Sequence, residues 1–366
     1  MSRVAVADAR DDAAGQALTV AVPRQDPERV VSAADLLASP APRRQPRWAP
    51  LLSYLVTLLI LLTFNFALPR LMPGNPIDAL MAFGSPNYVQ DDETRANLAG
   101  YYNLDGTLPE QFVHYLGGLV HGDLGVSIVS NVSVTQELAG RVGWSLLLVV
   151  AAIAISMAIG LPAGVQSSWK RGKRLDRGLL GFFLSVQNLP IFVVGSVVFI
   201  VLSAKLGIFP LGGATTPFNE YGGARQVLDV VHHLALPALL MGIDFATYQY
   251  LIMRSSMVSE LGSDYLLGGR AKGLSEHRLK YRYAGRNALL PVVTVVGLQF
   301  GVAVTGLVFI EQIFSYPGVG GYMIEAVGTR DYPAMQGAFL VLTITVVTTN
   351  LVVDLLYRRL DPRTAT

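Results

Sequence analysis

Six long apolar runs, separated by polar stretches, dominate the pattern of this chain. A helix that crosses a bilayer needs about 20 mostly apolar residues, and each run is close to that length or longer. The sequence therefore predicts an all-α, polytopic membrane protein whose transmembrane domain covers residues 47–366. Its six predicted transmembrane helices lie at about 48–68, 144–166, 178–204, 234–253, 289–310 and 334–357.

The composition agrees with lipid as the solvent for much of the surface. Of the 366 residues, 52% are hydrophobic and 15% are charged, whereas soluble domains contain about 25% charged residues. Residues 1–46 differ from the rest, because they mix both charges with five prolines and contain no long apolar core. This pattern predicts a flexible tail rather than a signal peptide. The chain has no cysteine, which excludes disulfides, thiol catalysis and cysteine metal sites.

The basic residues predict how the chain is oriented. Arginines and lysines cluster before the first span, between spans two and three, between spans four and five, and after span six. The alternate loops, including the long segment 69–143, are poor in them. The positive-inside rule then places both termini and the basic stretch 254–288 in the cytoplasm. The segment 69–143 becomes an outer loop, although the rule is calibrated on shorter loops.

The stretch 254–288 has the most specific local pattern. Ser263 and Ser275 suit helix N-caps, and Gly273 suits a left-handed turn. We expect two short helices joined at Gly273, with an exposed corner that docks on an acidic partner surface or a lipid phosphate. The alternative is a basic loop that only satisfies topology. The corner consists of Arg270, Ala271, Lys272, Gly273, Leu274, Ser275 and Glu276.

Polar residues inside the predicted spans are candidates for a translocation path. Asp244 is a carboxylate in the middle of a predicted span, and Tyr248 lies one turn further along the same face. A path, a proton role and a structural hydrogen bond are all open for Asp244. Helix packing is the alternative for the other candidates. These are Gln187, Asn188, Gln299 and Asn350.

Two of the outer loops carry further expectations. The loop 69–143 contains enough apolar residues for a small helical cap, which either docks an external protein or only covers the bundle. Tyr316, Pro317 and Gly318 begin a glycine-rich run between spans five and six. Such a run forms either an ordinary turn or a shallow outer gate.

Several kinds of chemistry have no matching motif. No phosphate-binding loop, nucleophile elbow or His-Glu-x-x-His motif occurs. The adjacent His232 and His233 would point to different faces of a helix, which is poor geometry for one shared metal. We therefore expect no enzymatic activity, no cofactor, no metal site and no nucleic-acid partner.

Many separated motifs in one order resemble the permease subunits of binding-protein-dependent ABC importers. The most similar branch is the first permease subunit of dipeptide, oligopeptide and nickel importers. The run at 270–275 followed by 286–291 resembles the coupling-loop signature of these proteins, and the similarity covers about residues 50–363. Further motifs lie at 73–76, 102–105, 121–125, 189–190, 236–239, 314–320, 331–333, 350–357 and 361–363.

The resemblance implies a type I importer fold in the inner membrane of a bacterium. It also implies a second homologous permease, two ATP-binding subunits or one fused tandem ATPase, and an extracytoplasmic peptide-binding protein. ATP and Mg²⁺ would bind to the ATPases, and the loop around Gly273 would be the cytoplasmic coupling helix that contacts one of them. The expected cargo is a dipeptide or short oligopeptide, with nickel or a metal chelate as the alternative.

One departure from the family pattern concerns this coupling loop. Where the wider family has Glu-Ala-Ala, six residues before the glycine, this chain has Leu267, Gly268 and Gly269. No coupling acid is therefore assigned at that position. An interpretation from another class is a stand-alone, proton-coupled carrier, but the small number of carboxylates inside the predicted spans disfavours it.

Overall fold

The computed structural model describes residues 49–72, 92–102, 105–218 and 221–360. The chain divides into two units, 1–46 with Thr366 and 47–365, and every described residue belongs to the second. The predicted flexible tail 1–46 therefore lies outside the described residues.

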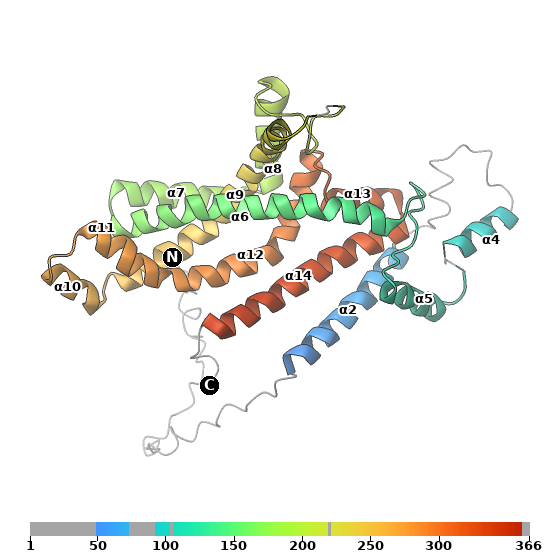
Figure 1. Cartoon of the computed structure of the whole chain (residues 1–366), viewed down its shortest axis with the longest axis horizontal. Helices are drawn as coiled ribbons and strands as arrows, with labels where there is room; N and C mark the ends of the chain where they lie inside the picture. Colours follow the sequence, from blue (N-terminus) through green and yellow to red (C-terminus); the bar gives the residue numbers. More distant parts are fainter. Residues whose placement is uncertain (1–48, 73–91, 103–104, 219–220, 361–366) are drawn as a thin grey trace, which may run out of the picture. The chain divides into compact units, whose positions relative to one another are not determined.

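Helices make up most of the described part of the chain, and no strand occurs among its residues (Figure 1). This confirms the predicted all-α polytopic class. In chain order, the elements are α2 (Ala49–Leu71), α4 (Asp92–Tyr101), α5 (Leu108–Val120), α6 (Val134–Trp169), α7 (Arg174–Asn188), α8 (Ile191–Val198), the π-helix η1 (Phe199–Lys205), α9 (Ala224–Glu260), α10 (Asp264–Ala271), α11 (Glu276–Arg278), the π-helix η2 (Leu279–Ala284), α12 (Gly285–Ile313), α13 (Val319–Thr329) and α14 (Tyr332–Leu360).

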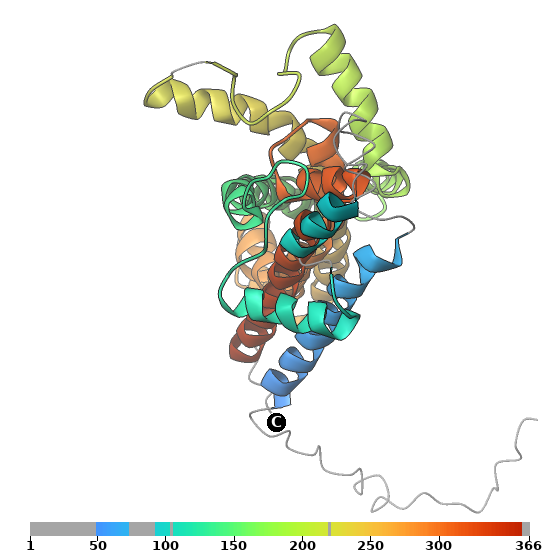
Figure 2. The same cartoon turned by 90° about the vertical axis from the view of Figure 1, so that its right-hand side faces the viewer.

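Five helices in the described residues are long and apolar enough to cross a membrane. A sixth candidate consists of α7 together with α8 and η1, which meet at an angle of 98°. The sequence predicts a span over 178–204, and the described structure has helix there in two parts separated by this bend. Figure 2 shows that α8 and η1, which follow the bend, project away from the rest of the helices.

Pro190 explains the bend in this third span. Proline has no N–H for the helix and disfavours helical backbone in the residue before it. Leu189 accordingly has φ −96° and ψ 124°, and Pro190 has φ −59° and ψ 127°, both extended conformations. The helix therefore stops at Asn188 and restarts in a new direction at Ile191.

Three other spans extend beyond their apolar runs. The helices α6, α9 and α12 begin before the predicted starts at 144, 234 and 289, and each also ends later than predicted. Hydropathy marks only the part of a helix that lipid surrounds, whereas the backbone hydrogen bonds continue into polar flanks. Part of the segment predicted as outer loop 69–143 is therefore the first turns of α6.

Small residues bring α6 and α9 into close contact. A Cβ on Gly160 would lie 2.7 Å from the carbonyl oxygen of Ala246, and one on Gly164 would lie 2.8 Å from Cβ of Met253. From the opposite helix, a Cβ on Gly242 would lie 2.8 Å from Cγ2 of Ile155. Small residues spaced four apart are a common interface between membrane helices.

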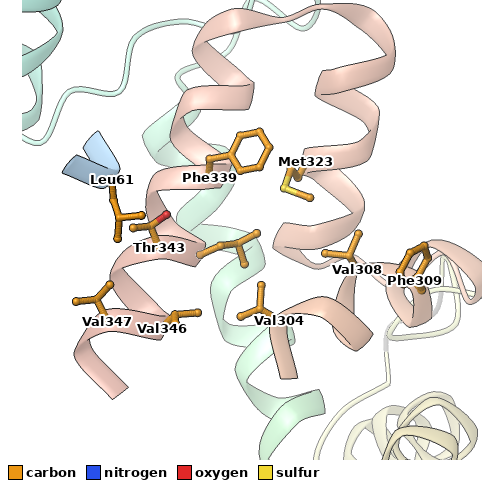
Figure 3. Close-up of a pocket in the computed structure, with 10 residues that line it drawn as sticks. Leu61, Val304, Val308, Phe309, Met323, Phe339, Thr343, Val346 and Val347 are labelled. Carbon is orange, nitrogen blue, oxygen red and sulfur yellow. The ribbon is translucent and has the colours of Figure 1, made fainter. Parts of the chain in front are cut away.

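An apolar pocket of about 460 Å³ lies among α2, α12, α13 and α14 (Figure 3). Figure 3 shows Leu61, Val304, Met323 and Phe339 converging on it from these four helices. Thr343 supplies the one side-chain polar group of the lining. This pocket offers apolar contact and almost no means of orienting a polar ligand.

Candidate functional site

The described structure forms a compact hairpin between α9 and α12. The hairpin, residues 264–278, consists of α10, a turn at Gly273, and α11. Gly273 has φ +75°, a conformation that favours glycine. The N–H of Gly273 donates to the Arg270 carbonyl at 2.9 Å, and that of Leu274 donates to the Gly269 carbonyl at 3.1 Å. These bonds close α10 and set the direction of the turn.

The second arm of the hairpin begins with a cap. The Ser275 hydroxyl accepts a hydrogen bond from the Arg278 N–H at 3.4 Å. Ser263 stands at the N-cap of α10 with extended backbone, but its side chain makes no capping bond. Both arms therefore begin at the predicted N-cap residues, Ser263 and Ser275. Only Ser275 forms the predicted side-chain capping bond.

The corner residues predicted to dock on a partner are mostly exposed. Arg270 and Glu276 face each other across the turn, with Nε and Oε1 3.0 Å apart. Their side chains are 47% and 59% exposed, so this pair orients the corner more than it stabilises it. Leu274 is half-buried and packs inward, so its side chain is only partly available to a partner. The exposed members are Arg270, Ala271, Lys272, Gly273, Ser275 and Glu276.

The base of the hairpin is fixed to the helices that flank it. Leu266 and Leu279 are fully buried in a cluster with Val165 and Met257. Gly269 touches this cluster so closely that a Cβ there would lie 2.6 Å from Cδ2 of Leu279. The absence of a side chain at Gly269 therefore lets α10 approach the second arm.

The second arm is not the separate short helix that the sequence predicts. α11 continues without a break into η2 and then into α12. Within η2, the ammonium of the buried Lys280 donates to Oε1 of Gln166 on α6, and Nε2 of Gln166 donates to the Tyr281 hydroxyl at 2.7 Å. Pro291 lies inside α12.

Tyr265 adds a polar link at the start of the hairpin. Its hydroxyl donates to the carboxylate of Glu260 at the end of α9. Burial and the neighbouring Glu260 raise the pKa of Tyr265 above its usual value. The phenol therefore keeps its proton, and with it this hydrogen bond, at neutral pH.

A buried ion pair lies between the hairpin and the bend in the third span. Asp176, in the first turn of α7, accepts two hydrogen bonds from the guanidinium of Arg254 on α9. The Ser167 hydroxyl and the Gly172 N–H donate to the same carboxylate. Sequence reasoning missed this pair, because Asp176 falls two residues before the predicted span and Arg254 was counted only as a loop charge.

The predicted path residues lie on four helices, α7, α9, α12 and α14. Gln187 and Asn188 are exposed at the end of α7, and the Asn188 amide donates to the Leu184 carbonyl at 2.6 Å. Asp244 is half-buried and Tyr248 is 43% exposed. A hydrogen bond between these last two is not among the contacts of the described residues.

Gln299 and Asn350 lie against neighbouring helices. Nε2 of Gln299 donates to the Phe245 carbonyl at 3.0 Å, and its Oε1 accepts from Nε2 of Gln249 at 2.9 Å. Gln249 also donates to the Ser156 hydroxyl at 2.8 Å, so these amides connect α6, α9 and α12. Asn350 is exposed on α14 and faces Gly301, whose Cβ position would lie 3.3 Å from Oδ1.

The glycine-rich run between spans five and six surrounds a buried carboxyl group. Oε1 of Glu311 accepts from the Ser145 hydroxyl at 2.6 Å, and Oε2 accepts from the Gly321 N–H at 3.0 Å. The Ser145 oxygen also accepts from the Val319 N–H at 2.9 Å. A Cβ on Gly318 would lie 1.9 Å from Oε1 of Glu311. The turn 314–321 is thus built around Glu311, which lies one residue beyond the predicted span.

The predicted gate residues belong to this turn. Tyr316 is 3% exposed, and its ring packs edge-on against Trp144 with centroids 6.1 Å apart. Gly318 is the N-cap of α13, and Pro317 lines a pocket beside it. The three residues therefore form a rigid, packed turn at the end of α12.

The adjacent histidines bind backbone carbonyls. The ring of His232 is 3.0 Å from the Ile208 carbonyl, and the ring of His233 is 2.9 Å from that of Asp229. The described residues contain no group of three His, Asp or Glu side chains arranged to hold a metal ion. A role in metal handling thus gains no support from this pair.

These features define a helical membrane protein with a rigid, exposed hairpin between two spans. Residues 156–366 match the family model described as "Binding-protein-dependent transport system inner membrane component". The chain belongs to this family, in the dipeptide and oligopeptide branch of ABC importer permeases. The resemblance drawn from the motifs is therefore confirmed.

Curated relatives cover most of the chain. The dipeptide transport system permease protein DppB of Escherichia coli (strain K12) is 35% identical over an alignment of 322 residues, which covers 83% of this chain and 93% of that protein. The di/tripeptide transport system permease protein DppB of Pseudomonas aeruginosa is 36% identical, covering 84% and 93%. The oligopeptide transport system permease protein AppB of Bacillus subtilis is 33% identical, covering 84% and 94%.

Proposed function

We propose that this chain is the permease subunit of an ATP-driven importer for dipeptides or short oligopeptides. The observation that carries the proposal is the exposed, well-packed hairpin 264–278 in a membrane protein of this family. The names of the relatives support a peptide as the cargo. ATP hydrolysis is assigned to partner subunits, because the sequence of this chain has no phosphate-binding loop.

The hairpin contacts one of the partner ATPases. Its corner offers exposed backbone around Gly273 and cations at Arg270 and Lys272, a combination that suits a groove with acidic residues. The full transporter contains a second, homologous permease, two ATP-binding subunits or one fused tandem ATPase, and an extracytoplasmic peptide-binding protein. ATP and Mg²⁺ bind to the ATPases and not to this chain.

The distribution of basic residues supports an orientation with both termini and the hairpin in the cytoplasm. The turn 314–321 is then at the outer side of the bacterial inner membrane, because α12 lies between it and the hairpin (Figure 1). In this orientation, ATP acts at one end of the helices and the peptide enters at the other.

Reconstitution tests the proposal. The chain is purified with its second permease and ATPases, inserted into liposomes, and supplied with the binding protein and a labelled dipeptide. We expect uptake that requires ATP, and none when the ATPases are omitted. Uptake by the chain alone, driven by a proton gradient, would overturn the proposal. Uptake of nickel chelates but of no peptide would overturn the cargo assignment.

A further inference from the structure

A second pocket, next to the turn 314–321, has a different character from the apolar pocket of Figure 3. Its volume is about 440 Å³, within the range of sites that bind small ligands. Three elements meet at it: the first turns of α6, the end of α12 with the turn, and α13. The lining residues are Arg141, Glu311, Gln312, Ser315, Tyr316, Pro317, Gly321, Ile324 and Glu325. We call this cavity the Glu311 pocket.

The Glu311 pocket carries both signs of charge. Arg141 contributes a guanidinium from α6, whereas Glu311 and Glu325 contribute carboxyl groups from α12 and α13. Arg141 is held in place by Glu137, with Nη2 and Oε2 3.1 Å apart, and by the ring of Tyr322, 4.7 Å from its Cζ. The ion pair with Glu137 uses only Nη2 of Arg141. The guanidinium has five N–H donors, so other donors remain for a ligand.

The two carboxyl groups have different roles in the pocket. Glu311 is fully buried, and its carboxyl group is held by hydrogen bonds from Ser145 and Gly321. It therefore makes this part of the pocket wall polar. Glu325 is exposed on α13, where a ligand can reach its carboxylate. A cationic group entering the pocket therefore meets an accessible anion backed by a second carboxyl group.

We propose that the Glu311 pocket binds a short zwitterionic peptide by its two charged ends. The Glu325 carboxylate takes the terminal ammonium group, and the Arg141 guanidinium takes the terminal carboxylate. This inference rests on the proposed function and adds to it a substrate site within this chain. A binding role would also account for the charged residues Arg141, Glu311 and Glu325 at the ends of the spans, where charges are costly.

The absence of native cysteine makes a direct test available. Ser315 is exposed in the pocket lining, so Ser315→Cys places a unique thiol of this chain there. Thr215→Cys is the control, because Thr215 is also exposed but is not among the residues that line the Glu311 pocket. The rate of maleimide labelling of each variant is measured in the assembled transporter without binding protein. The probes are Ala-Ala, N-acetyl-Ala-Ala and Ala-Ala-amide.

We expect Ala-Ala to slow labelling of Cys at 315 at least fivefold and to leave the control unchanged. Blocking either end of the probe should abolish most of this protection. In the Ser315→Cys background, Glu325→Gln should remove the preference for a free amino end, and Arg141→Gln the preference for a free carboxyl end. These paired losses separate direct binding from a remote conformational effect.

Equal labelling with and without Ala-Ala would overturn the proposed site. Protection that ignores both blocked ends, or that survives both charge-removing substitutions, would also overturn it. ATP-dependent uptake by the Ser315→Cys transporter with its binding protein is measured in parallel. If uptake persists while protection fails, the site is wrong and the proposed function stands. If no peptide is taken up even by the unmodified transporter, the proposed function itself fails.

Discussion

Arg254 and Asp176 form a bidentate pair, with Nε 2.8 Å from Oδ1 and Nη2 3.0 Å from Oδ2. Their side chains are 22% and 4% exposed. The pair joins α9, which leads to the hairpin, to the first turn of α7, which leads to the bend at Pro190. The Tyr250 hydroxyl, 2.7 Å from Oγ of Ser167, extends the same network to a ring that stacks on Phe183.

Asp176→Asn should lower the stability of the purified transporter. It leaves the Arg254 guanidinium without its counter-charge, and removing one partner of a buried pair costs about 3 kcal/mol or more. The measurement is the apparent melting temperature in detergent. Arg177→Gln, an exposed charge one residue further on, is the control and should change little. Equal effects of the two substitutions would show that the pair is not a structural link.

Gly273→Pro should abolish the stimulation of ATP hydrolysis by the peptide-loaded binding protein, while leaving membrane insertion intact. Proline fixes φ near −65°, whereas Gly273 has φ +75°, so the corner cannot keep its shape. The readout is the ratio of stimulated to basal ATPase activity in the assembled complex. An unchanged ratio would count against the hairpin as the contact with the ATPase.

Gly269→Ala and Gly268→Ala form a matched pair within α10. A Cβ at 269 would lie 2.6 Å from Cδ2 of Leu279, whereas a Cβ at 268 would meet nothing within 4 Å. Overpacking of this kind costs about 1–3 kcal/mol. We expect Gly269→Ala to reduce both thermal stability and coupled ATPase activity, and Gly268→Ala to change neither. A reversed order of effects would contradict the packing described for the hairpin.

Gly318→Ala should disrupt the turn 314–321, because its Cβ would overlap the Glu311 carboxyl group. Displacing that group breaks its bonds with Ser145 and Gly321, so transport should fall at least tenfold. Gly328→Ala on the same helix α13 is the control, since a Cβ there meets nothing within 4 Å. Uptake into proteoliposomes and expression level are measured for both. Full transport by Gly318→Ala would mean that Glu311 does not hold the turn.

The sequence carries enough information to predict the class, the approximate spans and the outline of the hairpin. Long apolar runs indicate helices that lipid surrounds. Gly273 indicates a left-handed turn and Ser275 an N-cap, so the spans and the hairpin can both be predicted from the sequence. The family motifs then identify the protein family. The bend in the third span was less accessible, because Pro190 marks an interruption but the 98° angle depends on packing.

The polar contacts between helices were the part that sequence reasoning missed. Asp176 and Glu311 lie just outside the predicted spans, so neither was considered as a buried carboxyl group. Gln249 on α9 has the same side chain as Gln299 on α12, to which it donates a hydrogen bond, but the sequence does not indicate that the two are paired. Such pairs form between residues distant in sequence, and a single sequence contains no signal for them beyond residue type.

The continuity of α11, η2 and α12 has a mechanical consequence. One uninterrupted run of helical backbone leads from Glu276 at the exposed corner to Ile313 beside Glu311. No loop lies between these two ends to absorb a displacement, and only the π-helical segment and Pro291 provide local compliance. A displacement of the corner would therefore reach the turn 314–321 through helical backbone alone, with η2 and Pro291 as the places where that backbone bends most easily.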